Sequence, residues 1–96
     1  MIRSFGSRST EDVFYGEDTK AARRFPKVLW PVIRRKLDLL HGASRLIDLA
    51  APPGNRLEAL GGDQSGRHSI RANDQYRITF RFAGDGAWEV RCEDYH

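Results

Sequence analysis

Side chains that can act on a phosphodiester gather in the last third of the sequence. Arg71 and Arg77 lie in a strand-like segment, and the sequence closes on Asp94, Tyr95 and His96. A guanidinium is planar and permanently charged, so it can form two hydrogen bonds to one phosphate. Histidine changes charge near neutral pH and can act as an acid or a base. Together these residue types favour chemistry on an RNA backbone.

RNA supplies its own nucleophile, the 2′-hydroxyl, so cleavage needs a base, cations on the phosphoryl oxygens and a proton donor for the departing 5′-oxygen. We expect His96 to be the titrating group, with Asp94 either orienting its ring or acting as the base. Tyr95 can stack on a base or hydrogen-bond the phosphate. We expect Arg71 and Arg77 to bind the phosphate, and Arg77 to meet most of the transition-state charge.

This chemistry requires neither a metal nor a cofactor, and we expect none. The three histidines and the single cysteine, Cys92, do not have the spacing of a zinc site. We do not expect His41 or His68 to be catalytic. The glycines between residues 61 and 66 do not match a phosphate-binding fingerprint, which requires a following helix. We interpret this segment as a flexible hairpin loop.

Alternation along the strands explains how the arginines can share a surface, because successive side chains point to opposite faces of a sheet. In the run 76–82, one face is apolar and is assigned to the core: Tyr76, Ile78, Phe80 and Phe82. The other face is expected to meet solvent and carries Arg77, Thr79 and Arg81.

The pair Asn73-Asp74 favours a tight turn before this strand. A hairpin at this turn would bring Arg71 and Arg77 to one polar face. On periodicity alone, a structural interpretation also stands: Arg77 and Arg81 can form salt bridges with acids of the last strand, namely Glu89, Glu93 or Asp94.

The last strand follows the turn Gly84-Asp85-Gly86, and its apolar residues Trp88, Val90 and Cys92 are assigned to the core face. Strict alternation would place Asp94 on that same face, away from the arginines. We therefore expect the strand to end or to twist before Asp94.

The N-terminal half is expected to hold the elements that support this sheet. Residues 1–5 favour a short strand, and Ser9-Thr10 can begin a helix that ends near Gly16. Between 19 and 41 an apolar stripe predicts a second helix: Leu29, Val32, Ile33, Leu37 and Leu40. Because proline fits only the first turn of a helix, the main helix either begins near Trp30-Pro31 or is broken there.

After Gly42, a further helical turn spanning Leu46 to Leu49 can begin at Ser44. The stiff segment Ala51-Pro52-Pro53-Gly54-Asn55 then divides a helical half from a strand half that begins with a strand at 56–60.

The charge pattern suggests a local anion-binding patch. The net charge is only +3, but 13 of the 16 basic residues are arginine, the better partner for ordered contacts with nucleic acid. A GC-rich genome would produce the same bias. Since affinity grows with the number of phosphates neutralised, any binding must come from a local cluster. Arg34, Arg35 and Lys36 are expected to form a solvated face of the main helix.

Length and composition predict one domain spanning residues 1–96. The single cysteine excludes an internal disulfide and fits a reducing compartment. The N-terminal residues lack the apolar run of a signal peptide or a membrane span. We therefore expect a cytoplasmic protein without a membrane partner.

Three segments together carry a resemblance to a known family: Pro52-Pro53-Gly54-Asn55-Arg56-Leu57-Glu58-Ala59-Leu60, Ser69-Ile70-Arg71-Ala72-Asn73-Asp74-Gln75-Tyr76-Arg77-Ile78, and Asp94-Tyr95-His96. With the order of strand, two helices and antiparallel strands, the chain resembles the HigB toxins of the RelE/ParE superfamily over almost its whole length. The resemblance implies an α+β, RelE-like (microbial-ribonuclease-like) fold, with an N-terminal strand and two helices packed on a C-terminal antiparallel sheet.

The resemblance also implies a function and its residues. It implies a type II toxin that cleaves mRNA in the ribosomal A site and is neutralised by a HigA-like helix-turn-helix antitoxin, with the complex binding operator DNA. The family's terminal motif falls on Asp94, Tyr95 and His96, and its phosphate-binding arginines on Arg71 and Arg77. Asn73 stands where a turn asparagine helps to shape the site.

Two positions depart from what many relatives show. Glu58 stands where some carry a histidine, and Gly61 stands where many carry a lysine. Two alternatives therefore stay open: a ParE-like inhibitor of DNA gyrase without RNA cleavage, and a weakened toxin that acts mainly as a partner of an antitoxin or operator complex. The terminal motif favours the nuclease.

Overall fold

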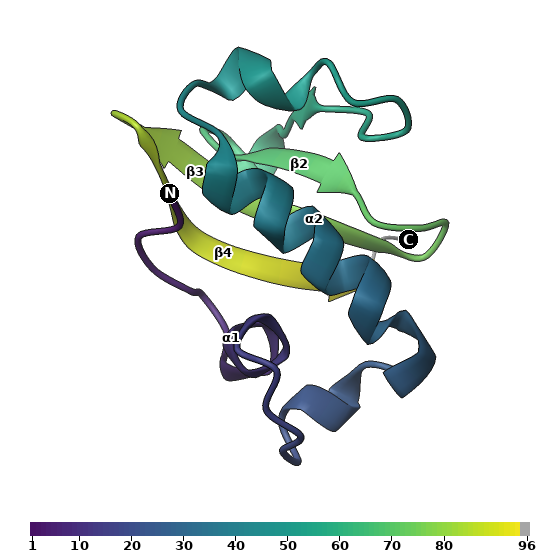
Figure 1. Cartoon of the computed structure of the whole chain (residues 1–96). Coiled ribbons are helices and arrows are strands. Elements are labelled where there is room, and N and C mark those ends of the chain that lie inside the picture. The colour runs from purple at the N-terminus through teal and green to yellow at the C-terminus, as the bar shows by residue number, and fades with distance from the viewer. Residues whose placement is uncertain (95–96) are drawn as a thin grey trace.

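The computed structural model describes residues 1–94, and in them two helices pack with a four-stranded antiparallel sheet (Figure 1). The helices are α1 (Arg8–Phe14) and α2 (Trp30–Gly42). The strands follow each other in space in chain order: β1 (Glu58–Ala59), β2 (His68–Arg71), β3 (Tyr76–Ala83) and β4 (Gly86–Asp94). The α+β fold predicted from the sequence is confirmed.

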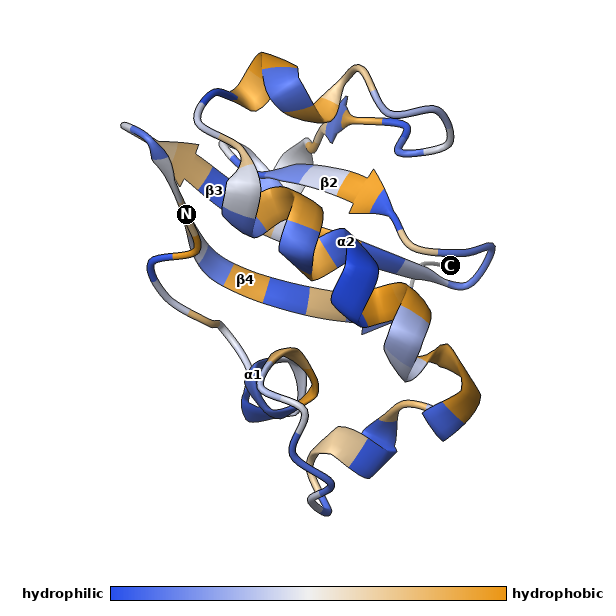
Figure 2. Ribbon diagram, in the orientation of Figure 1, coloured by the Kyte–Doolittle hydropathy of each residue, from blue (hydrophilic) through white to orange (hydrophobic). Residues whose placement is uncertain are grey.

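The core lies between α2 and the sheet, which α2 crosses on one face (Figure 1). The apolar stripe of α2 is buried at Ile33, Leu37 and Leu40, and it packs with strand residues that include Ile78 and Phe80. Figure 2 shows the corresponding alternation of apolar and polar residues along β4. Burial of each large aliphatic side chain stabilises the fold by roughly 1.5–3 kcal/mol, which fixes the helix over the sheet.

The main helix begins at Trp30 with Pro31 in its first turn, as in the first of the two alternatives above. Residues before it form two short 3-10 turns, η1 (Ala22–Arg24) and η2 (Lys27–Leu29). The first helix begins earlier than expected, because Ser7 and not Ser9 is its cap: Ser7 Oγ accepts a hydrogen bond from the Thr10 amide at 3.3 Å.

The expected strand at 1–5 is reduced to two isolated parallel bridges, which join Ile2 to Ala87 and Phe5 to Val90. Backbone bonds from the Arg3 amide to Ala87 O and from the Gly6 amide to Val90 O cover the outer edge of β4 there. The strand expected at 56–60 is likewise limited to β1. Two further 3-10 turns, η3 (Leu46–Leu49) and η4 (Gly62–Gln64), flank it in sequence.

The open face of the sheet, opposite α2, differs from the expectation in its burial. Arg77 and Thr79 are buried, and only Arg81 of the three expected polar residues is exposed. Neighbouring polar side chains from β2 and β4 surround them, so a polar face need not be a solvated one. The assignment of Arg77 and Thr79 to solvent was therefore wrong.

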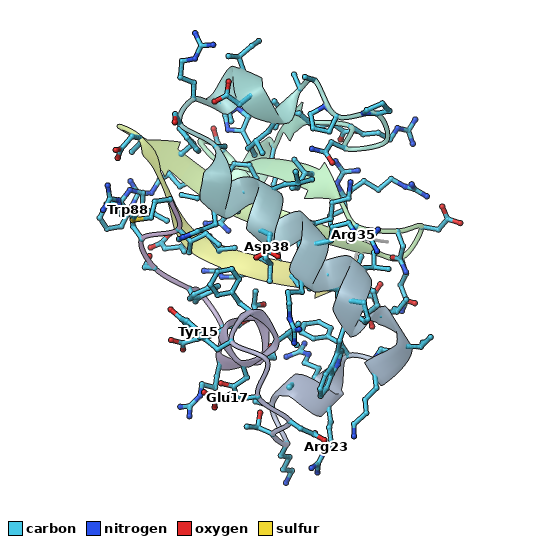
Figure 3. The ribbon with its side chains drawn as sticks, viewed as in Figure 1. Tyr15, Glu17, Arg23, Arg35, Asp38 and Trp88 are labelled. Carbon is cyan, nitrogen blue, oxygen red and sulfur yellow. The ribbon has the colours of Figure 1, made fainter. Side chains whose placement is uncertain are left out.

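A bulge in β4 explains a second difference. Thr79 pairs with Arg91 while Arg81 pairs with Trp88, so β4 has one extra residue there, and Glu89 adopts a positive φ of 53°. The bulge reverses the phase of the strand before it. Trp88, which we assigned to the core, is therefore 38% exposed and lies at the outer side of the sheet (Figure 3).

The last strand also runs further than expected. β4 continues through Asp94, which pairs with Tyr76. The expectation that the strand ends or twists before Asp94 was wrong, because the ladder to β3 persists to that residue. Within residues 1–94, no helix has both the length and the apolar character needed to cross a bilayer.

The Asp12 carboxylate fastens α1 to the chain that follows it. It accepts hydrogen bonds from Thr19 Oγ1 at 2.6 Å and from Arg8 Nε at 3.1 Å. The bond from Thr19, assisted by Arg8, holds the pKa of Asp12 below its ordinary value of 3.8. Because the folded-state pKa is depressed, this stabilisation is complete above pH 3.8 and is lost as the pH falls through the lower value.

We therefore expect Asp12→Asn to lower the free energy of unfolding at pH 7, and the deficit relative to the wild type to shrink as the pH falls below about 4. Urea unfolding at pH 7 and at about pH 3 measures both quantities. Asp63→Asn, a change at an exposed loop acid, is the control. A deficit that is equal at both pH values would contradict an ionic role for Asp12.

Candidate active site

Arg77 is a buried arginine whose guanidinium is held in one orientation. Its Nε donates to Ser69 Oγ at 2.8 Å and its Nη2 donates to the Arg56 carbonyl at 2.6 Å. Its Nη1 forms a long ion pair with Glu58, whose Oε1 lies 3.9 Å away. The residue is only 5% exposed. A fixed cation of this kind can stabilise developing negative charge without first reorganising.

An unusual backbone conformation orients the Arg56 carbonyl that accepts the hydrogen bond from Arg77. Arg56 has a φ of 47°, in the left-handed region that a residue with a side chain rarely adopts. The preceding residue, Asn55, is fully buried, and its Nδ2 donates to the Leu49 carbonyl at 3.1 Å. Lys36 Nζ donates to Asn55 Oδ1 at 2.5 Å. Asn55 thus ties the connector to α2 and to the 46–49 turn.

Lys36 departs from the expectation of a solvated Arg34–Lys36 face. It is half-buried, and burial, together with the charges of Arg35 and Arg71, lowers its pKa. Arg35 is exposed, as expected, and projects from α2 (Figure 3). The sequence shows Asn55 in the stiff connector, but no periodic pattern pairs it with Lys36, because the contact joins two distant segments.

Replacement of Asn55 tests this corner. We expect Asn55→Ala to lower the free energy of unfolding by about 3 kcal/mol, because it leaves the Leu49 carbonyl and the Lys36 ammonium without their partner. Urea unfolding followed by circular dichroism gives the value. The exposed loop change Ser65→Ala should stay within about 0.5 kcal/mol of the wild type. A similarly small effect at Asn55 would refute its role as an anchor.

Arg71 lies opposite Arg77 in the β2–β3 register, so the sequence correctly placed the two guanidinium groups on one face. Arg71 Nη2 forms an ion pair with Asp74. The two arginines line a cavity of about 290 Å³ together with Arg56, Glu58, Asn73 and Asp74. Three cations and two acids leave this cavity with an excess of one positive charge.

Asn73 shapes the turn at the edge of this cavity. Its Oδ1 accepts hydrogen bonds from the backbone amides of Gln75 at 2.9 Å and Tyr76 at 2.7 Å. This side-chain turn fixes the start of β3 and therefore the strand that carries Arg77.

Asp94 lies at the end of the sheet beside the same turn. Its Oδ2 accepts a hydrogen bond from Gln75 Nε2 at 3.1 Å. Its pairing with Tyr76 places it on the α2 side of the ladder, opposite the side that carries Arg77. Burial, and then the charge of Asp94, raises the pKa of Tyr76. Tyr95 and His96 lie outside the described residues.

Arg67 forms a second polar cluster on the open face, which sequence reasoning missed. It is 8% exposed, and its Nη2 donates to Thr79 Oγ1 at 3.0 Å and to the Glu89 carbonyl at 2.8 Å. Thr79 Oγ1 in turn donates to Glu93 Oε2 at 2.7 Å. Burial lowers the pKa of Arg67. The acidic residues of β4 thus bind Arg67 and Thr79, whereas Arg77 forms an ion pair with Glu58.

Comparison with known proteins identifies the family of this chain. Residues 4–96 match the HigB-like toxin family, described as the RelE-like toxin of type II toxin-antitoxin system HigB. The chain belongs to this family. It is 45% identical over 69 residues to Toxin HigB-1 of Vibrio cholerae, a match that covers 72% of each protein. The predicted resemblance to HigB toxins is confirmed.

Two solved structures share the fold. A YafQ variant from E. coli superposes with a TM-score of 0.64 at 14% identity, over 98% of this chain and 93% of that one. The YoeB-YefM complex from Staphylococcus aureus gives 0.61 at 16% identity, over 100% and 98%. Membership of a toxin-antitoxin family supports an antitoxin as the partner of this chain.

Proposed function

We propose that this toxin is an endoribonuclease that cuts mRNA on the ribosome. The observation that carries the proposal is the buried guanidinium of Arg77, fixed by Ser69 and the Arg56 carbonyl and paired in register with Arg71 at an open cavity. Two guanidinium groups on one face suit the oxygens of a phosphodiester.

The proposed reaction is an attack within the RNA. The 2′-oxygen forms a bond to phosphorus, the bond from phosphorus to the 5′-oxygen breaks, and the products are a 2′,3′-cyclic phosphate and a free 5′-hydroxyl. A base takes the proton of the 2′-hydroxyl, and an acid gives a proton to the 5′-oxygen. Arg77 stabilises the negative charge that develops on the phosphoryl oxygens, and Arg71 binds the phosphate.

The proton-transfer groups are proposed at the end of the chain. His96 serves as the acid or the base, a role to which the histidine side chain is suited. Asp94 orients His96 or takes the proton, and Tyr95 binds the base or the phosphate. Glu58 is a second carboxylate at the cavity, half-exposed and 3.9 Å from Arg77 Nη1. It is therefore a further candidate for the base that takes the proton of the 2′-hydroxyl.

The ribosome supplies what so small a protein lacks. Positioning of reacting groups contributes several kcal/mol to catalysis, and this site is an open cavity on the face of a four-stranded sheet. A ribosome presents mRNA as a single, unstacked strand, the form that side chains recognise best. We further propose a cytoplasmic location, a HigA-like antitoxin and operator binding through the complex with it.

A weakened toxin is the second candidate, and the contact between Glu58 and Arg77 favours it. A carboxylate beside the guanidinium opposes part of the positive charge that the transition state needs. Gly61 adds no cation in compensation. In this case the chain would act mainly through an antitoxin or operator complex.

Mapping mRNA 5′ ends after induction in growing cells tests the proposal. The nuclease predicts new 5′ ends at codon-linked positions within translated regions. Gyrase-cleaved DNA without such ends would reject it in favour of a ParE-like inhibitor. The absence of both, with an antitoxin still bound, would identify the weakened toxin.

A further inference from the structure

A second cavity region lies between η1 and the end of β4 that carries Asp94, away from the Arg71 and Arg77 cavity. One cavity of about 450 Å³ runs from Tyr76 and Asp94 to Arg24, and another of about 510 Å³ runs from Arg24 to Lys20. The two share three lining residues, Ser7, Ser9 and Arg24. We call these two adjoining cavities together the η1 groove, since Arg24 of η1 lines both.

The η1 groove is rich in cations. Arg8, Lys20, Arg24 and Arg91 line it, and Glu93 and Asp94 lie at its end near the sheet. Arg8 pairs with Asp12, but within residues 1–94 no carboxylate lies within ion-pair distance of Lys20, Arg24 or Arg91. The other acids nearby are engaged: Glu93 accepts from Thr79, and Asp18 pairs with Arg23 and Lys27. The exposed side chains of Lys20 and Arg24 are therefore available to bind an external anion.

Arg91 joins this groove to the candidate active site. It pairs with Thr79 in the ladder and so projects from the open face that carries Arg77. Adjacent strands lie about 4.8 Å apart, so the step from β2 to β4 is about 10 Å. Basic residues thus follow a line from Arg71 and Arg77, past Arg91 at the edge of the sheet, to Arg24 and Lys20. Glu93, which pairs with Arg77 in the ladder, is the acid that interrupts this line.

The η1 groove also reaches Asp94, which lies on the side of the ladder opposite Arg77. Asp94, a proposed proton-transfer residue, and Tyr76, which follows the Asn73 turn, line its inner end. Arg24 is close enough to oppose the rise in the pKa of Tyr76. An anionic chain that leaves the scissile linkage across β4 would therefore enter this groove directly.

We propose that the η1 groove binds the sugar-phosphate backbone of the substrate RNA on one side of the scissile linkage. Lys20 and Arg24 contact phosphates there. This inference rests on the proposed nuclease function and extends it, because it makes the helical half of the chain part of the substrate-binding surface. The contacts are made before and during the reaction alike, so they act on substrate binding and not on the chemical step.

The test compares two double variants that remove the same charge. Lys20→Ala with Arg24→Ala removes from the η1 groove the two exposed cations that have no carboxylate of residues 1–94 within ion-pair distance. Arg23→Ala with Arg35→Ala removes two exposed arginines that do not line it; Arg23 lies on the same 3-10 turn as Arg24 (Figure 3). Cleavage of a defined mRNA is followed in a reconstituted translation reaction over a range of potassium concentrations.

We expect the groove variant to raise KM about tenfold with kcat nearly unchanged. The slope of log(kcat/KM) against log salt should become shallower by about 1.4, because each phosphate contact of a single strand contributes about 0.7. The control variant should behave as the wild type. A groove variant with the same KM and salt dependence as the control would overturn the inference, and this is also the result expected if the groove binds an acidic segment of an antitoxin instead.

Two further outcomes are separable. If the wild type cuts no mRNA, the proposed function fails together with this inference. If the groove variant loses its folded circular dichroism spectrum, Lys20→Gln with Arg24→Gln, which keeps longer side chains, replaces it in the same comparison with the same two criteria.

Discussion

Arg77→Ala is expected to reduce mRNA cleavage by about 100-fold or more, the usual effect of removing a fixed group that stabilises transition-state charge. Arg81→Ala should change the rate less than about threefold, because Arg81 is an exposed residue on the same strand. The measurement is the single-turnover rate on ribosome-bound mRNA. Equal effects at the two positions would mean that a diffuse charged surface, and not a fixed guanidinium, acts on the phosphate.

Stability must be separated from catalysis in this experiment, because Arg77 is buried. Its loss leaves Ser69 Oγ and the Arg56 carbonyl without a donor, at about 1–3 kcal/mol for each buried unsatisfied group. Arg77→Lys keeps the charge but loses the forked geometry. We expect it to recover part of the lost stability while cleavage stays at least about tenfold below the wild type. Full activity of this variant would show that only the charge matters.

Deletion of His96 is expected to reduce cleavage by about 10²- to 10⁴-fold, the contribution of one general acid or base. Induced in cells, the truncated protein should no longer arrest growth. Its thermal unfolding and its binding of an antitoxin should match those of the full chain, because the buried core residues of the described fold extend no further along the chain than Cys92. His96→Gln, which keeps a polar side chain without a titrating group, is the companion variant.

The outcome distinguishes a catalytic from a positioning role for the end of the chain. Unchanged toxicity of the truncated protein would reject the assignment of His96. If the truncation is inactive but His96→Gln is active, the residue holds substrate or neighbours in place and Asp94 becomes the leading candidate for proton transfer.

Local patterns in the sequence determined much of this protein. Alternation and the Asn73-Asp74 turn were enough to place Arg71 and Arg77 side by side, since a hairpin with a short turn fixes its own register. The first-turn rule for proline gave a start of α2 at Trp30-Pro31 as one of two alternatives, and this is the one observed. These features depend only on neighbouring residues, and the resemblance to HigB toxins, carried by three such segments, named the correct family.

Local patterns failed where a single irregularity shifts the phase of a strand. The bulge at Glu89 turned Trp88 outwards, although its spacing from Val90 and Cys92 predicted a core residue. Strand pairing up to Asp94 likewise overrode the expected end of β4. A bulge and the length of a ladder are set by the partner strand, which periodicity within one strand does not contain.

Only the tertiary structure decided which polar residues are buried and which residues line the η1 groove. Asn55, Lys36 and Arg67 meet partners 12 to 22 residues away in sequence, and Arg24 comes to line a groove with Asp94 of the last strand. The sequence by itself determined the residue types and the strands that carry the candidate chemistry. The supports of Arg77 and the η1 groove arise from contacts between distant segments, which form only when hydrophobic burial brings α2 and the sheet together.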